Sequence, residues 1–178
     1  MATAVQKDAG VVGHEERTRR SRLLLSRRLS RGETHVPMID VYAADDLFPP
    51  GSERQLGKEL TFALLRAEGV LSPGPTHLNN TGAYLHRMLP RDVQTAASAT
   101  ARTVRIQIVT PPSVLTREAQ RQLVKEATEI VAKISGDPSQ AGRTWVLLTE
   151  AAEGGWGIAG TAFGREEFAA LAAKSRRS

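Results

Sequence analysis

The feature that most constrains the fold is a strand–helix–strand pattern that the sequence contains twice. In each copy a short apolar strand is followed by a helix with apolar residues every three or four positions, and then by a second strand. A connection of that length predicts parallel strands joined by a right-handed crossover. The first copy has strands at 37–43 and within 79–88 around a helix between Ser52 and Gly69; the second has strands at 104–108 and 145–149 around a helix at 117–134.

Local signals mark the ends of both predicted helices. Ser52 and Gln55 have the spacing of a capping box, and Gly69 is a suitable stop. Thr116 precedes the second helix, and Gly136 follows it. The remaining connections are predicted as a loop at 71–78 and as short helix or coil at 90–102.

The predicted fold class is therefore α+β. Two tandem β-α-β units side by side make a four-stranded sheet with both helices on one face. No helix of the chain is left to cover the other face, which predicts that this face is buried against other subunits. The predicted domains are a disordered basic extension at 1–36, one folded domain at 37–164 with units at 37–90 and 102–164, and a short helix with a basic tail at 165–178.

The positive charge of the chain, +5 overall, lies at its two ends. Residues 1–35 hold eight lysines and arginines against four acidic residues, a net +4, and Lys174, Arg176 and Arg177 add three more. The body between them carries a net charge of −2 and does not resemble a polyanion-binding platform. Nucleic acid is thus not an expected partner of the folded part.

Composition excludes several classes of site. The chain has no cysteine, so it contains no disulfide, thiolate zinc cluster or cysteine nucleophile. No apolar run approaches the roughly 20 residues of a membrane helix, and we expect a soluble cytoplasmic protein without membrane contact. His77 and His86 have no carboxylates at ligand spacing, and Asp45-Asp46 is typical of a solvated turn, so no metal and no cofactor is expected.

Three interpretations compete for residues 1–36: a basic arm that touches nucleic acid or membrane, an organellar transit peptide, or translated sequence upstream of the real start codon. The third is favoured. Val36 can be encoded by GTG, an alternative bacterial start, and Gly32-Glu33 can be encoded as a sequence that resembles a ribosome-binding site. Initiation at Val36 and removal of the initiator methionine would leave Pro37 as the first residue.

Pro37 opens the first strand and is the candidate catalytic residue. At a true N-terminus its nitrogen is a secondary amine, a compact base held rigidly by its own ring and by the following strand. Inside a longer chain the same nitrogen is an amide without usable basicity. The chemistry of the site thus depends on whether Pro37 is the N-terminal residue.

Other candidates accompany Pro37. Residues 155–160 match GxGxxG, but no strand with an acidic residue can follow before the chain ends, so a hairpin or bulge that places Trp156 against a ligand or a neighbouring subunit is favoured over a dinucleotide site. Four arginines lie on or beside strands, and an anionic substrate would need one of them. These candidate arginines are Arg87, Arg102, Arg105 and Arg143.

The opening Pro37-Met38-Ile39-Asp40-Val41-Tyr42, the two β-α-β units and the segment from Thr149 to Gly160, TEAAEGGWGIAG, resemble the 4-oxalocrotonate tautomerase family of the tautomerase superfamily. Two tandem units resemble its fused form, which implies a homotrimer that mimics a hexamer of single units. The resemblance implies a cofactor-independent isomerase in which Pro37 is the general base of keto–enol tautomerisation. Trp156 matches the aromatic wall of the pocket.

The sequence also departs from the family pattern. Members usually carry an arginine just after the first strand and another at the start of the last, where this chain has Leu47 and Trp145. A small aromatic or enolic carbonyl compound is therefore expected in place of a dicarboxylate, with Trp145 and the four arginines as candidate substrate contacts. The second unit begins without a proline, so one active site per chain is expected.

Two alternatives remain. The same superfamily includes hydrolytic dehalogenases, which need two arginines and an acid to activate water, and neither arginine occupies the matching position. A non-catalytic trimeric binding protein, with an acylated Pro37 and a basic N-terminal arm, is the alternative from another class. A free Pro37 amine distinguishes the enzyme from this binding protein.

Overall fold

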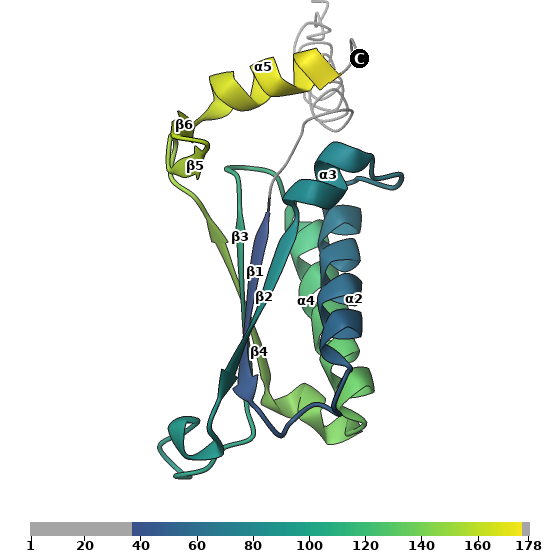
Figure 1. The fold of residues 1–178 in the computed structure, drawn as a ribbon, viewed down its shortest axis with the longest axis vertical. Coiled ribbons are helices and arrows are strands. Elements are labelled where there is room, and N and C mark those ends of the chain that lie inside the picture. Colours follow the sequence, from purple (N-terminus) through teal and green to yellow (C-terminus); the bar gives the residue numbers. More distant parts are fainter. Residues whose placement is uncertain (1–36, 176–178) are drawn as a thin grey trace, which may run out of the picture.

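The computed structural model describes residues 37–175 (Figure 1), so the predictions made for residues 1–36 and 176–178 lie outside the described part. Two layers, one of strands and one of helices, form its body. The strands are β1 (Met38–Ala44), β2 (Gly82–Met88), β3 (Val104–Thr110), β4 (Thr144–Glu150), β5 (Trp156–Ile158) and β6 (Thr161–Phe163). The α-helices are α2 (Glu53–Ala67), α3 (Pro75–Asn80), α4 (Arg117–Ser135) and α5 (Arg165–Ser175), and short 3₁₀ turns lie at η1 (Pro90–Asp92) and η2 (Pro138–Arg143).

The main sheet has the strand order β2-β1-β3-β4. β1 is parallel to β2 and β3 is parallel to β4, whereas the central pair β1 and β3 is antiparallel. Each parallel pair encloses one long helix in sequence, and α2 and α4 lie side by side on one face of the sheet (Figure 1). The predicted α+β fold of two tandem β-α-β units is confirmed.

The single main core lies between the sheet and these two helices. Alternate strand residues face it because successive side chains of a strand point to opposite faces. Ile39, Val41, Ile106 and Ile108 are all at most 2% exposed. From the helices come the apolar stripes that the sequence predicted, Leu56, Leu60, Ala63 and Leu64 of α2 and Leu123, Ala127, Ile130, Val131 and Ile134 of α4.

The opposite face of the sheet, called the open face below, has no helix over it in the described part of the chain (Figure 1). It carries the other alternate residues of β1 to β4, and three large ones are exposed: Tyr84 at 54%, Trp145 at 51% and Leu147 at 41%. Exposed aromatic and aliphatic side chains gathered on one face mark an interaction surface.

The two helix starts differ. Thr116 caps α4 as expected, since its Oγ1 accepts a hydrogen bond from the Ala119 amide at 3.1 Å. The capping box predicted at α2 is wrong, because Ser52 has helical backbone angles and its hydroxyl instead donates to the Pro49 carbonyl at 2.7 Å. Gln55 donates to Glu59 along the helix.

Two segments contain structure that the sequence left open. The predicted loop at 71–78 ends in a short helix, α3, which begins at Pro75, a residue suited to a first helical turn. Residues 156–163 form the hairpin β5–β6, as predicted for the glycine cluster, and its turn residues Ala159 and Gly160 have φ of 49° and 79°, the left-handed pair of a type I′ turn. No helix of the described residues has the length and apolar character to cross a membrane.

Candidate functional site

Pro37 lies at the start of β1, at the end of the sheet from which β5, β6 and α5 extend (Figure 1). Its side chain is buried, and its carbonyl oxygen accepts a hydrogen bond from the Gly82 amide of β2 at 3.3 Å. The regular ladder that follows, from Met38↔Gly82 onward, fixes its position. We call this end of the sheet the proline end.

Trp156 lies at the proline end as well. The β5–β6 hairpin places its indole, which is 7% exposed, against Phe168 of α5, and Met38 and Val109 pack against the same small cluster. Met38 follows Pro37 directly and faces Val109 across the β1–β3 ladder. The structure therefore places Trp156 against Met38, the residue that follows Pro37.

Tyr84, which the sequence analysis did not single out, lies on the other flank of Met38. A Cβ atom placed on Gly82 would be 3.0 Å from the Met38 sulfur, 3.1 Å from Cε2 of Tyr84 and 3.3 Å from its hydroxyl oxygen. The Tyr84 ring therefore folds back along β2 over Gly82, toward the proline end. A glycine inside a strand often marks a close approach of this kind, and this signal at Gly82 could have identified the contact.

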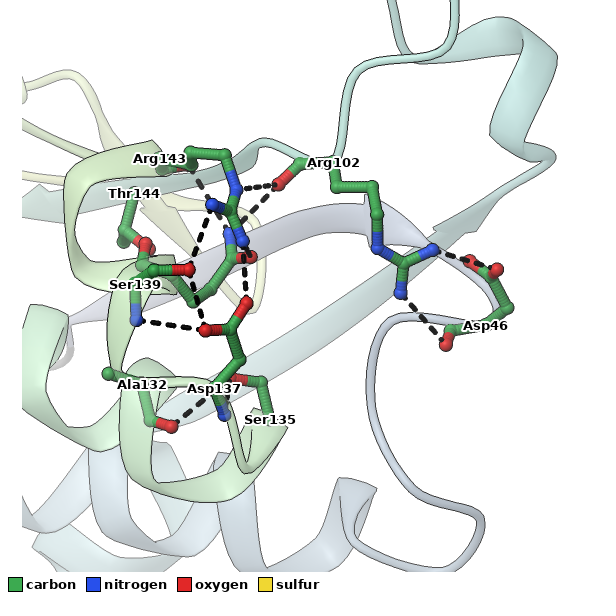
Figure 2. A network of polar contacts seen from close by, with 9 residues as sticks. Asp46, Arg102, Ala132, Ser135, Asp137, Ser139, Arg143 and Thr144 are labelled. Atoms are coloured by element: carbon green, nitrogen blue, oxygen red, sulfur yellow. Dashed lines mark hydrogen bonds and ion pairs between the residues drawn. The ribbon is translucent and has the colours of Figure 1, made fainter.

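Three of the candidate arginines lie at the far end of the sheet, where β1 ends and β4 begins. Arg102 pairs with Asp46 at 2.9 Å. Arg143 pairs with Asp137 at 2.7 Å and also donates to Ser139 and to the Arg102 carbonyl (Figure 2). Hydrogen bonds from Ser139, and then from Arg143, hold the pKa of Asp137 below its usual value.

Arg87 lies near the same end but on the helix side of the sheet. It forms an ion pair with Glu53 in the first turn of α2. In the β1–β2 ladder Arg87 is opposite Ala43, six residues along β1 from Pro37, a separation of roughly 20 Å at the usual rise of a strand. Within one protomer Arg87 therefore does not reach Pro37.

Arg105 and Trp145 are neighbours on the open face, in register with each other and with Tyr42. The Arg105 guanidinium carbon lies 5.1 Å from the centre of the Tyr42 ring, and the ring stacks on His86 with centroids 4.3 Å apart. His86 Nε2 lies 2.5 Å from the Asp40 carboxylate. This row of charged and aromatic groups crosses the open face close to the far end, because Arg105 and Trp145 are the second residues of β3 and β4.

A buried carboxyl group was also missed. Glu68 follows the last turn of α2 and is 8% exposed, and neither of its carboxyl oxygens has a hydrogen-bond partner among the described residues. Burial raises its pKa to about 8, because the charged form loses its hydration without gaining a partner. Glu68 is thus protonated at neutral pH.

The outer face of the helix layer has a separate hollow of about 410 Å³ between α2 and α4. Arg66 and Glu126, which form an ion pair across the two helices, line it together with Phe62 and Ile130. None of the predicted site residues lines this hollow. The proline end remains the candidate functional site.

The sequence model of the family described as Tautomerase enzyme matches residues 104–166, which is the second unit together with the hairpin of Trp156. No curated protein matches the chain.

Solved structures share the fold over most of the chain. A fused 4-oxalocrotonate tautomerase (4-OT) named as a wild-type symmetric trimer is 20% identical with a TM-score of 0.60, over 76% of this chain and 98% of its own. A macrophage migration inhibitory factor-like protein from Entamoeba histolytica is 15% identical with a TM-score of 0.57, over 72% and 99%. A protein named as inactivated by 2-oxo-3-pentynoate is 17% identical with a TM-score of 0.59, over 70% and 93%.

Proposed function

We propose that this chain, a member of the tautomerase superfamily in its fused tandem form, is a cofactor-independent keto–enol tautomerase whose general base is the amine of Pro37. One observation carries the proposal: a buried proline opens the central strand β1 of this fold, and the next residue, Met38, packs in the cluster of the Trp156 indole. The substrate would be a small carbonyl or enol compound.

The proposed chemistry follows from the surroundings of Pro37. The amine would take a proton from the carbon next to a carbonyl group and return it at another position, so that keto and enol forms interconvert. Pro37 is buried, and burial disfavours an ammonium ion and so favours the neutral amine that can accept this proton. The proposal requires processing that leaves Pro37 at the N-terminus.

We further propose a homotrimer assembled through the open face. On the β4 side of this face Trp145 and Leu147 are exposed, and two fused 4-OT structures similar to this chain are named as trimers. In such an assembly Arg105 of one protomer could contact substrate at the proline end of another, which no candidate arginine does within a protomer. Sedimentation equilibrium is expected to give three times the mass of one chain, and a monomer would contradict this assembly.

The test of the base uses protein that begins at Pro37, with its N-terminus verified by mass spectrometry. Phenylenolpyruvate should be converted to its keto form, followed by ultraviolet absorbance, and a Pro37→Ala variant should lose on the order of 10²-fold or more in kcat/KM. The 178-residue chain, in which Pro37 is acylated, should be nearly inactive. Full activity of that longer chain would overturn the assignment of the base.

A second readout uses a covalent probe. The ynone 2-oxo-3-pentynoate accepts amine nucleophiles at its triple bond, and a similar protein is named as inactivated by it. We expect one equivalent to add to the Pro37 nitrogen, located by peptide mass spectrometry, and no addition to the 178-residue chain at that residue. Absence of both turnover and labelling would favour the non-catalytic binding protein.

A further inference from the structure

The Tyr84 hydroxyl and Pro37 both lie near Gly82, at the proline end of the sheet. Gly82 connects the two: its amide donates to the Pro37 carbonyl at 3.3 Å, and the position of an added Cβ on Gly82 is 3.3 Å from the Tyr84 hydroxyl oxygen. The Tyr84 side chain is 54% exposed, and no hydrogen bond to its hydroxyl is found among the described residues. Tyr84 lies on β2, at the opposite edge of the sheet from Trp145 and Leu147 of β4, so in the proposed trimer its phenol stays available to a bound molecule.

The proposed reaction needs such a group. When a base removes the proton next to a carbonyl, negative charge develops on the carbonyl oxygen, and a positioned hydrogen-bond donor lowers the barrier. Met38 and Val109 have no side-chain hydrogen-bond donor, and the Trp156 indole has a single one, its N–H. Arg87, Arg102 and Arg143 of the same protomer are held by acidic partners away from Pro37.

We infer that Tyr84 is a second catalytic residue of the proposed tautomerase, whose phenol donates a hydrogen bond to the carbonyl oxygen of the substrate. This inference rests on the proposed function and names a further group of the same site. The Pro37 amine takes the proton, the C–H electron pair becomes the C=C bond, and the carbonyl π pair moves to oxygen. The proton held by Pro37 then passes to that oxygen to give the enol, and Tyr84 keeps its own proton throughout.

Gly82 has a defined part in this arrangement. Any side chain there would meet the Tyr84 ring and the Met38 sulfur at 3.0–3.3 Å, closer than ordinary van der Waals contact. Because Gly82 has no Cβ, the Tyr84 ring can lie along β2 with its hydroxyl over Gly82. Gly82 is thus a positioning residue that acts through Tyr84.

The test is Tyr84→Phe in protein that begins at Pro37. The change removes only the hydroxyl, so the open face keeps its aromatic ring and the trimer should persist. We expect kcat for phenylenolpyruvate to fall on the order of 10²-fold, with KM changed by less than about threefold. The matched control is Tyr42→Phe, a hydroxyl removed from the same face of β1, which should keep kcat within about twofold.

A second variant tests the positioning. Gly82→Ala should lower kcat in the parent protein by displacing the Tyr84 ring, but should add little loss in the Y84F background, because the hydroxyl is already gone. Equal losses in both backgrounds would show that Gly82 acts on folding or on Met38 instead, and would overturn its role.

Failure of this inference can be told apart from failure of the proposed function. If protein beginning at Pro37 turns over substrate and is labelled by 2-oxo-3-pentynoate, while Y84F retains kcat within about twofold, Tyr84 is not the donor and the proline base stands. If the parent protein neither converts substrate nor is labelled, the proposed function is wrong, and so is the inference about Tyr84. If Y84F is labelled to completion but turns over slowly, both are supported.

Discussion

The two ends of the sheet differ in how their polar groups are satisfied. At the far end Arg102 and Arg143 are bound to Asp46 and Asp137, and a buried Gln140 donates to the Arg102 carbonyl at 2.9 Å (Figure 2). At the proline end Pro37 is buried, Met38 packs against the apolar cluster of Trp156, and the Tyr84 phenol is exposed. Paired polar groups stabilise a fold, whereas an unpaired polar group beside an apolar cluster is suited to contact a ligand. The proline end is therefore better suited to bind substrate than the far end.

The largest effect is expected from removing the Trp156 side chain at the proline end. Trp156→Ala deletes a large side chain that is 7% exposed, and we expect a loss of about 3–5 kcal/mol in the free energy of unfolding. In protein beginning at Pro37 it should also lower kcat/KM by on the order of 10-fold or more, because water then reaches the amine. Thermal unfolding and the ketonisation assay measure the two effects.

The control is Phe62→Ala, an aromatic side chain in the hollow on the outer helix face. Its kcat/KM should stay within about twofold. An equal loss of activity in both variants would mean that the Trp156 effect is one of general destabilisation.

The buried Glu68 makes the free energy of unfolding depend on pH. Its pKa is raised from 4.5 to about 8, so between these values the folded protein holds a proton that the unfolded chain has released. The free energy of unfolding should therefore fall as pH rises through this window, by roughly 3 kcal/mol between pH 4.5 and 7. Asp137 at the far end, with its lowered pKa, acts in the opposite sense, and its contribution is lost on acidification.

Glu68→Gln should abolish the loss at rising pH and leave the variant more stable than the parent at pH 7. Denaturant unfolding from pH 5 to 8 measures this. Glu129→Gln, at an exposed position of α4, is the matched control and should keep the parent's pH slope. A parent protein whose stability does not change over this range would contradict the buried, protonated state of Glu68.

The smallest expected effect concerns the far-end arginines. Arg143→Met should reduce the free energy of unfolding by about 1 kcal/mol, since the surface ion pair to Asp137 and the bond to Ser139 are lost. Its kcat/KM should remain within about twofold. Arg105→Met, which alters the open face, should change kcat/KM more, and the opposite ranking would indicate that the far end contacts substrate.

Much of the fold was predictable because its signals are local. The apolar alternation of Val104, Ile106 and Ile108, the Thr116 cap and the left-handed Gly136 each depend on residues a few positions apart. The Tautomerase family model matches residues 104–166, and the solved fused 4-OT structure shares the fold of the chain. The Ser52 prediction was wrong because a proline turn supplied a nearer acceptor for its hydroxyl.

The site was less predictable because it depends on register. The sequence indicated that four arginines lie near strands, but only the pairing of Arg87 with Ala43 and of Arg105 with Tyr42 reveals how far they lie from Pro37. The approach of Tyr84 to Met38 likewise requires β1 and β2 to be aligned at Gly82. Whether Pro37 is the base stays a prediction.

The most direct measurement compares two proteins that differ by one residue, one beginning at Pro37 and one beginning at Val36. In the second protein the Pro37 nitrogen is an amide, while the fold, Trp156 and Tyr84 are retained. We predict that the protein beginning at Pro37 ketonises phenylenolpyruvate and that the addition of Val36 lowers kcat/KM by at least about 10²-fold. Equal activity of the two proteins would contradict the proline base.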